Sequence, residues 1–221
     1  MTKKKAKDYK KRQDRQFLKG RTYRDYIEYI SQHLDVFITQ RDTVYNDGTG
    51  GSFIQTFQFV GTSLQFAIYQ QERTSRCMLQ GVSRLETLLE KELFRKYVPV
   101  LLADRGSEFS AAEAMEIDSE GTRRTRVFYC DPMQSGQKGS LENHHSLLRY
   151  LLPKETDLRA LGLTDQSALN LVLSHVNSFP VEKLGGKSPL ELTEFLYYDL
   201  YERLTQFGIQ KIEKGAVKKL P

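Results

Sequence analysis

Three acidic residues stand where a folded chain could bring their carboxylates together. Asp42 lies on the apolar face of a predicted strand. Asp104 follows a near-continuous apolar run, which is typical of a buried strand, and Glu142 lies in the first turn of a predicted helix after a glycine-rich stretch. Carboxylates held close together repel one another unless a cation binds among them. Oxygen ligands favour Mg²⁺ or Mn²⁺, and two such ions suit phosphoryl transfer. On spacing alone, the plainer alternative, in which each acid caps a helix or joins a surface ion pair, carries more weight.

Hydrophobic periodicity predicts the elements that would position these acids. Three β-rich runs at 35–45, 52–60 and 64–71 predict consecutive antiparallel strands, because a short Gly-Thr-Ser link joins the last two. The remaining predicted elements are a helix over 74–96, a buried strand over 98–103, a short helix over 108–117, a strand over 125–130, and helices over 140–152, from about 164 to 176, and over 188–208. A mixed sheet with helices on both faces is the natural packing. Strands of such sheets present ligand-binding residues at their carboxyl ends, so Asp42 and Asp104 can be neighbours if the first strand lies beside the buried one.

Composition indicates a globular chain with an ordinary core. The chain has 221 residues, of which 39% are hydrophobic, and this content excludes wholesale disorder. Two cysteines, Cys77 and Cys130, are too few for a disulfide framework or a four-cysteine zinc site, so we expect buried thiols in a reducing cytoplasm. The charged start does not resemble a signal peptide, and the uncharged stretch 48–71 is too polar for a membrane helix.

Charge is distributed unevenly along the chain. The net charge is +5, but residues 1–24 hold eleven Lys or Arg and two Asp, and residues 211–221 hold four Lys and one Glu. The intervening chain is therefore acidic, which would suit a protein that binds cations. Basic ends favour a polyanionic partner, although such runs are more often solvated tails. We interpret residues 1–30 as a basic tail or linker.

Four segments carry a recognisable pattern. They are QRDTV at 40–44, ADRGSEF at 103–109, FYCDPMQSGQKGSLENHH at 128–145 and VNSFPVEKLGGKSPLE at 176–191. On these segments the chain resembles DDE transposases of the RNase H-fold superfamily with retroviral-integrase-like cores. More narrowly, it resembles the bacterial insertion-sequence transposases of the IS-thirty family. The last three segments together are highly specific, the first is weak by itself, and the resemblance covers roughly residues 21–195.

The resemblance implies a fold and an activity. The expected fold is an α/β, RNase H-like mixed five-stranded sheet, with three antiparallel strands and then two parallel ones, flanked by helices. The catalytic core would span 31–155 and a helical C-terminal extension 156–221. Asp42, Asp104 and Glu142 would bind two Mg²⁺ ions, for which Mn²⁺ can substitute. The implied reaction is nicking at transposon ends, followed by attack of the freed 3′-hydroxyl on target DNA.

The same resemblance implies partners and a location. The partners would be DNA, as transposon ends and target, and further copies of the chain in a homodimer or higher oligomer. No membrane is implied, and the location would be the bacterial cytoplasm, at the nucleoid. Candidates for DNA contact near the third acid are Lys138, Asn143, His145 and Arg149. The alternative for Lys138 and Arg149 is that both are solvated cations on a helix face.

The sequence departs from the family pattern in three respects. Arg105 replaces the usual Asn after the second acid, where it could contact a DNA phosphate or weaken metal binding. The usual tryptophan is missing, since the chain has none. No helix-turn-helix reader precedes the first predicted strand. We therefore expect an excised catalytic domain, a truncated copy or one part of a split protein.

Three functions remain open on the sequence. The first is an active DNA strand-transfer core. The second is a catalytically inactive remnant that binds DNA or oligomerises and so inhibits a full-length transposase. The third is a general RNase H-fold nuclease, such as a junction resolvase. The acidic triad favours the first and third, and the segment 176–191 favours the first over the third.

Overall fold

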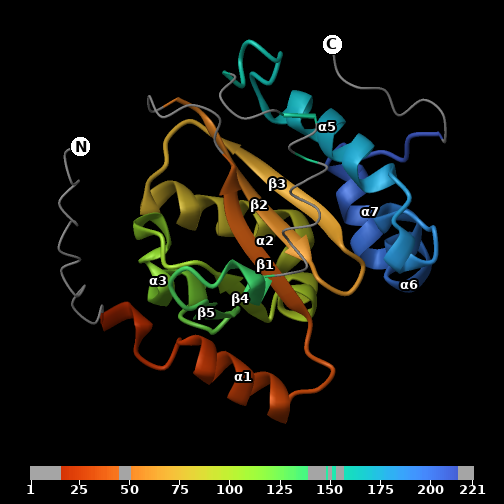
Figure 1. Cartoon of the computed structure of the whole chain (residues 1–221). Coiled ribbons are helices and arrows are strands. Elements are labelled where there is room, and N and C mark those ends of the chain that lie inside the picture. The colour runs from red at the N-terminus through yellow and green to blue at the C-terminus, as the bar shows by residue number, and fades with distance from the viewer. Residues whose placement is uncertain (1–15, 45–50, 139–147, 149–150, 153–156, 214–221) are drawn as a thin grey trace, which may run out of the picture.

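A five-stranded mixed sheet forms the centre of the protein in a computed structural model, which describes residues 16–44, 51–138, 148, 151–152 and 157–213 (Figure 1). The strands are β1 (Ile38–Val44), β2 (Phe53–Phe59), β3 (Leu64–Gln70), β4 (Val100–Ala103) and β5 (Arg126–Tyr129). Their order is β3-β2-β1-β4-β5. The first three strands pair antiparallel, whereas β4 pairs parallel with both β1 and β5. The predicted sheet is confirmed.

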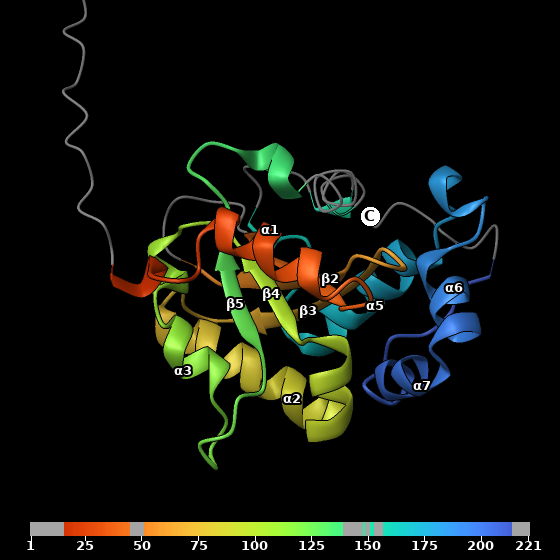
Figure 2. The ribbon, with the colours of Figure 1, turned by 90° about the horizontal axis from the view of Figure 1, so that it is seen from below.

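Helices cover both faces of this sheet and one of its edges. They are α1 (Tyr23–Gln32), α2 (Ser75–Tyr97), α3 (Ala112–Glu116), α5 (Gln166–Ser178), α6 (Pro189–Leu196) and α7 (Tyr198–Gln206), with short 3₁₀ turns η1 (Gln16–Leu18), η2 (Ser107–Phe109), η3 (Ser135–Lys138) and η4 (Glu182–Leu184). Figure 2 shows α1 on one side of the sheet, α2 and α3 on the other, and α5 to α7 beyond β3. Among the described residues, no helix is long and apolar enough to span a bilayer.

The apolar run in β4 is explained by burial on both faces. Leu101 and Ala103 join the main core, to which the apolar stripe of α2 also belongs. Val100 and Leu102 point the other way and pack with Tyr26 of α1 in a second, smaller cluster. A strand with helices over both faces is hydrophobic at every position, whereas a half-exposed strand alternates. This packing fixes β4 between two layers and leaves its carboxyl end free to present a polar residue.

The outer edge of β3 is closed by side chains of α5. The backbone N–H of Tyr69 donates to Gln166 Oε1 at 2.9 Å, and Gln166 Nε2 donates to the carbonyl of Ala67 at 3.0 Å. Two residues earlier in β3, Asn177 exchanges two hydrogen bonds, of 2.8 and 2.7 Å, with the backbone of Gln65. These amides replace a neighbouring strand, so α5 satisfies backbone groups that an open edge would expose.

Two helical predictions differ from the structure. The cap predicted at Ser188 forms, but the single helix predicted over 188–208 is two helices, α6 and α7. Tyr197 separates them with φ −142° and ψ 63°, and its ring lies 5.1 Å from that of Phe37. This long-range aromatic packing accompanies a break that the helical periodicity did not reveal. The short helix predicted over 108–117 is a 3₁₀ turn, η2, followed by the five-residue α3.

Part of the segment expected to be a tail is folded against the sheet. Within residues 1–30, η1 and α1 are formed, and Thr22 caps α1 in a reciprocal capping box with Asp25. The Arg21 guanidinium lies 2.8 Å from a carboxylate oxygen of Glu116. The ring of Phe17 packs edge-on against Tyr129 at 5.1 Å. The folded part of the chain therefore includes residues ahead of the first strand.

Candidate active site

Asp42 and Asp104 lie at the carboxyl ends of adjoining parallel strands. The register of β1 and β4 pairs Gln40 with Leu102, and each aspartate stands two residues further along its own strand direction. Asp42 belongs to β1, and Asp104 directly follows the last residue of β4. Because parallel strands end at the same sheet edge, the structure brings these two predicted residues together.

Lys138 joins the two aspartates. Its ammonium nitrogen lies 2.8 Å from Asp42 Oδ2, as a hydrogen bond, and 3.9 Å from Asp104 Oδ2. Only 8% of the lysine side chain is exposed, against 22% for Asp42 and 49% for Asp104. Lys138 is the last residue of η3, which follows β5 in the chain. The residue predicted to contact DNA is thus paired with the acids themselves.

The turn after β4 holds the Asp104 carboxylate. The backbone N–H of Gly106 donates to Asp104 Oδ1 at 2.9 Å. Burial raises the pKa of Asp104, and nearby Asp42 adds to this, whereas Lys138 and the Gly106 N–H oppose it. A Cβ at position 106 would lie only 2.6 Å from Glu108 Oε2 and 3.0 Å from Asp104 Oδ1. A side chain at this position would push the two carboxylates away from the turn.

Glu108 is a buried carboxylate whose ion pair with Arg73 sequence reasoning missed. Its side chain is 5% exposed, and Arg73 Nε donates to its Oε1 at 2.8 Å, with a second hydrogen bond from Nη2. The arginine comes from the segment before α2, 35 residues away, so no local pattern indicated the pairing.

Arg41 is a second residue that the sequence reasoning passed over. It is fully buried, and its guanidinium lies 4.4 Å from the centre of the Phe109 ring. Nη1 contacts the sulfur of Met115 at 2.7 Å, but Nε and Nη2 have no hydrogen-bond partner in the part of the chain that the structure describes. Burial lowers the pKa of Arg41 to about 10. The sequence held a signal for this position: successive residues of a strand point to opposite faces, so Arg41 lies on the face of β1 opposite to Asp42.

Arg105, the departure from the family pattern, bridges the ends of β4 and β5. Its Nε donates to the carbonyl of Cys130 at 2.9 Å, and Nη2 lies 2.8 Å from Asp131 Oδ1. Gln137 completes this loop, because its Oε1 accepts from the Asp131 N–H at 2.7 Å. Arg105 therefore ties together the two strand ends that lead to Asp104 and to Lys138.

The remaining candidates fall outside the described residues. They are Glu142, Asn143, His145 and Arg149. Leu148, Leu151 and Leu152 of the same predicted helix are described, and all three are buried. Within the described ranges, no group of three or more His, Cys, Asp or Glu residues is arranged to hold a metal ion. The third acid of the predicted triad stays a prediction.

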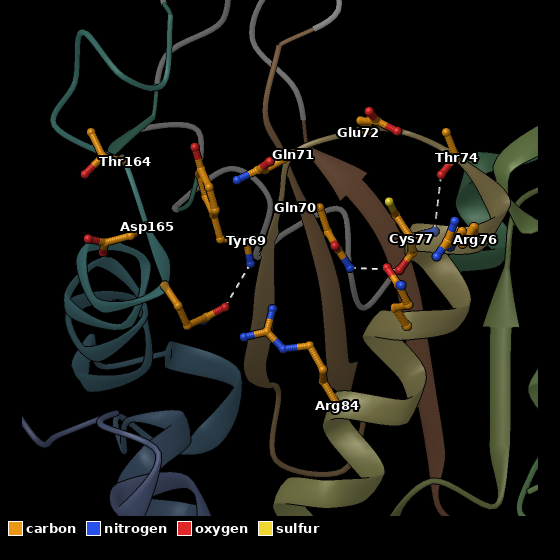
Figure 3. A pocket seen from close by; sticks show the side chains of 12 residues that line it. Tyr69, Gln70, Gln71, Glu72, Thr74, Arg76, Cys77, Arg84, Thr164 and Asp165 are labelled. Atoms are coloured by element: carbon orange, nitrogen blue, oxygen red, sulfur yellow. Dashed lines mark hydrogen bonds between the residues drawn. The ribbon is translucent and has the colours of Figure 1, made fainter. Parts of the chain in front are cut away.

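A separate hollow of about 550 Å³ lies between β3, the start of α2 and the start of α5. Figure 3 shows Arg84 extending from α2 into it, with Thr164 and Asp165 on the facing wall. Its charged lining residues carry both signs, and neither Asp42 nor Asp104 is among them. This hollow is distinct from the aspartate pair.

The fold places the protein in a structural class. The sheet and its flanking helices have the RNase H-like architecture of retroviral-integrase-type catalytic cores. A chain of the simian T-cell lymphotropic virus intasome, solved in complex with the PP2A regulatory subunit B56 gamma, superposes with a TM-score of 0.53. That match covers 70% of this chain and 53% of the other, at 16% sequence identity, and so concerns the fold alone.

Sequence comparison identifies more specific relatives. The chain is 34% identical over 92 residues to the transposase of insertion sequence element IS1086 from Cupriavidus metallidurans, which is 42% of this chain and 25% of that protein. It is 33% identical over 91 residues to the transposase InsI of element IS30A from Escherichia coli, which is 41% and 22%. No family model matches the chain. The predicted resemblance is confirmed: this chain carries a segment related to IS30-type transposases, spanning about a quarter of those relatives.

Proposed function

We propose that this chain is the catalytic core of a DDE transposase that nicks DNA at transposon ends and joins the freed 3′-hydroxyl to target DNA. The observation that carries the proposal is the pairing of Asp42 and Asp104 at adjoining parallel strand ends, with Lys138 in contact with both. The relationship to IS30-type transposases supports the same reaction.

The residues at this edge fit a divalent metal. Asp42 and Asp104 offer carboxylate oxygens, which Mg²⁺ and Mn²⁺ prefer, and Glu142 is proposed as the third ligand. The ammonium of Lys138 contacts both aspartates, so the two carboxylates already bind one positive charge. Two bound ions would supply activation of the attacking oxygen and stabilisation of the leaving oxygen.

Two successive displacements at phosphorus make up the proposed reaction. In the first, a water oxygen attacks a phosphodiester at the transposon end, and the bond to the 3′-oxygen breaks. In the second, that 3′-hydroxyl attacks a phosphodiester of the target, whose own 3′-oxygen leaves. The carboxylates orient the reacting groups, and cationic side chains at this edge bind phosphate oxygens. Positioning and charge stabilisation of this kind account for most of the catalysis in phosphoryl transfer.

The proposed partners follow from the same reaction. DNA is the substrate in both steps, and the basic residues of 1–15 add sequence-independent affinity for its phosphates. Joining two transposon ends to one target calls for a homodimer or larger assembly. The chain would act on bacterial DNA in the cytoplasm, at the nucleoid.

The test is Mn²⁺-supported nicking of a supercoiled plasmid, together with joining of a labelled 3′-hydroxyl oligonucleotide to it. We expect Asp42→Asn, Asp104→Asn and Glu142→Gln each to reduce nicking by orders of magnitude, because charge stabilisation dominates phosphoryl transfer. Asp199→Asn is the matched control: its carboxylate pairs with Lys96 on another part of the surface, so nicking should persist.

The outcomes separate the three functions. Nicking and joining that both depend on the acids support the transposase core. Nicking without joining supports a general nuclease. A folded chain whose residual nicking is unchanged in all three acid variants is an inactive remnant, and the proposal is then wrong.

A further inference from the structure

Lys138 occupies the position at which the two candidate metal ligands come together. Its ammonium is within 2.8 Å of Asp42 and 3.9 Å of Asp104, and its side chain is nearly buried. A buried ammonium is costly unless charged partners surround it, and two adjacent carboxylates are costly unless a cation lies between them. Each side of this contact therefore stabilises the other.

The surrounding charges are already paired. The acids at this edge and in the adjoining turns each contact a cation among the described residues: Asp42 and Asp104 contact Lys138, Glu108 contacts Arg73, and Asp131 contacts Arg105. An added divalent ion therefore meets carboxylates whose charge is compensated. Lys138 is the cation that contacts the same two carboxylates as the proposed metal ion would.

We propose that Lys138 is a positioning residue that holds Asp42 and Asp104 together in the metal-free protein and gives up this place when a metal ion binds. The inference rests on the proposed function, because it takes the two aspartates as metal ligands. The lysine ammonium is a point charge on a flexible four-carbon stem, so it can withdraw without movement of the strands. The displaced ammonium is then available to a DNA phosphate, which is the role predicted for it from the sequence.

The proposal makes Lys138 a competitor of the metal, which affinity measurements without DNA can detect. We would titrate Mn²⁺ into the full chain by isothermal calorimetry and compare it with Lys138→Met. Met keeps the unbranched stem and removes the charge. We expect the variant to bind Mn²⁺ at least about tenfold more tightly, since one adjacent charge commonly shifts an ionisation equilibrium by that factor or more.

Thermal unfolding supplies a second readout, the stabilisation by Mn²⁺, which a purely structural role of Lys138 would not increase. Without metal, Lys138→Met should melt at a lower temperature than the wild type, because its two carboxylates repel one another. Saturating Mn²⁺ should raise the melting temperature of Lys138→Met more than that of the wild type. Lys96→Met is the matched control: it removes one charge from a surface ion pair with Asp199, so its Mn²⁺ affinity should stay within twofold of wild type.

The competing results are distinct. Equal or weaker Mn²⁺ binding by a folded Lys138→Met overturns the inference, and Lys138→Gln provides the same measurement if the Met variant does not fold. If Lys138→Met binds Mn²⁺ more tightly but the chain never nicks DNA, the inference about Lys138 holds and the proposed function is wrong. If nicking depends on both aspartates but Lys138→Met gains no metal affinity, the proposed function holds and the inference is wrong.

Discussion

Replacing either of two buried arginines by Met should change the free energy of unfolding, in opposite directions for the two positions. Arg41 is fully buried, has no carboxylate partner among the described residues, and leaves two nitrogens without hydrogen bonds. Arg124 is also buried, but its Nη1 lies 2.6 Å from Glu86 and its Nε donates to the carbonyl of Met115 at 2.8 Å. A buried charge without a carboxylate partner destabilises the folded state, so removing it stabilises the protein. Removing one member of a buried ion pair leaves the other charge unpaired, and this destabilises the protein.

The magnitude for Arg41→Met follows from its environment. Burial lowers the pKa of Arg41 to about 10, and this change corresponds to a cost of about 3 kcal/mol for holding the charged form in the folded protein. At neutral pH the side chain is charged in both states, so the full cost applies, and it is relieved only as the pH rises above about 10. The contact with the Phe109 ring offsets roughly 0.5–2 kcal/mol of it. We expect Arg41→Met to raise the free energy of unfolding by about 1–2 kcal/mol.

Urea unfolding at neutral pH without metal is the assay. Arg124→Met, the matched variant, should lose roughly 3 kcal/mol, because Glu86 would keep its charge in a site that is largely closed to solvent. The two midpoints should therefore move to opposite sides of the wild-type value. An Arg41→Met midpoint below that of the wild type would refute the reasoning, because it would mean that the buried guanidinium is stabilised where it lies.

Three further predictions follow from the site, the sheet edge and the charged start of the chain. Burial raises the pKa of Asp104, so the folded state favours its protonated form, and stability that it contributes at low pH is lost as the pH rises. Because Asp42, at 2.8 Å, remains the nearer partner of Lys138, Asp104→Asn should melt at or above the wild-type temperature at pH 7 without metal, and Mn²⁺ should stabilise it less. Asn177→Ala should cost about 1–3 kcal/mol in urea unfolding, because it strips both side-chain hydrogen bonds from Gln65 on β3. Deleting residues 1–15 should flatten the salt dependence of DNA binding, measured by fluorescence anisotropy between about 50 and 200 mM salt.

Each of these has a contrary outcome. A melting temperature for Asp104→Asn well below that of the wild type would show that Lys138 needs both carboxylates for stability. Unchanged stability in Asn177→Ala would mean that water replaces the amide at the edge of β3. Deletion of 1–15 is chosen because Phe17 packs against Tyr129 of β5 and Arg21 pairs with Glu116 of α3. An unaltered salt slope would place the DNA contacts elsewhere.

The amino-acid sequence by itself determined the order and type of the main elements, and it placed Asp42 on the apolar face of one strand and Asp104 at the end of another. Alternating and continuous hydrophobic runs encode which face of a strand is buried, and this periodicity was sufficient for β1 to β5. Asp104 follows a run that only a doubly covered strand can have, and parallel strands end at one edge. The juxtaposition of Asp42 with Asp104 also requires β1 to pair with β4, and the strand order of the folded sheet decides that.

Tertiary structure alone decided which charges pair around that edge. Lys138 reaches Asp42 across 96 positions of the chain, and Arg73 reaches Glu108 across 35. The break at Tyr197 between α6 and α7 lies beside aromatic rings from distant segments. Periodicity specifies the face on which a side chain lies, but not which distant residue meets it there. That choice belongs to the packed molecule, because burial makes an unpaired charge costly and so selects the partner that the fold can supply.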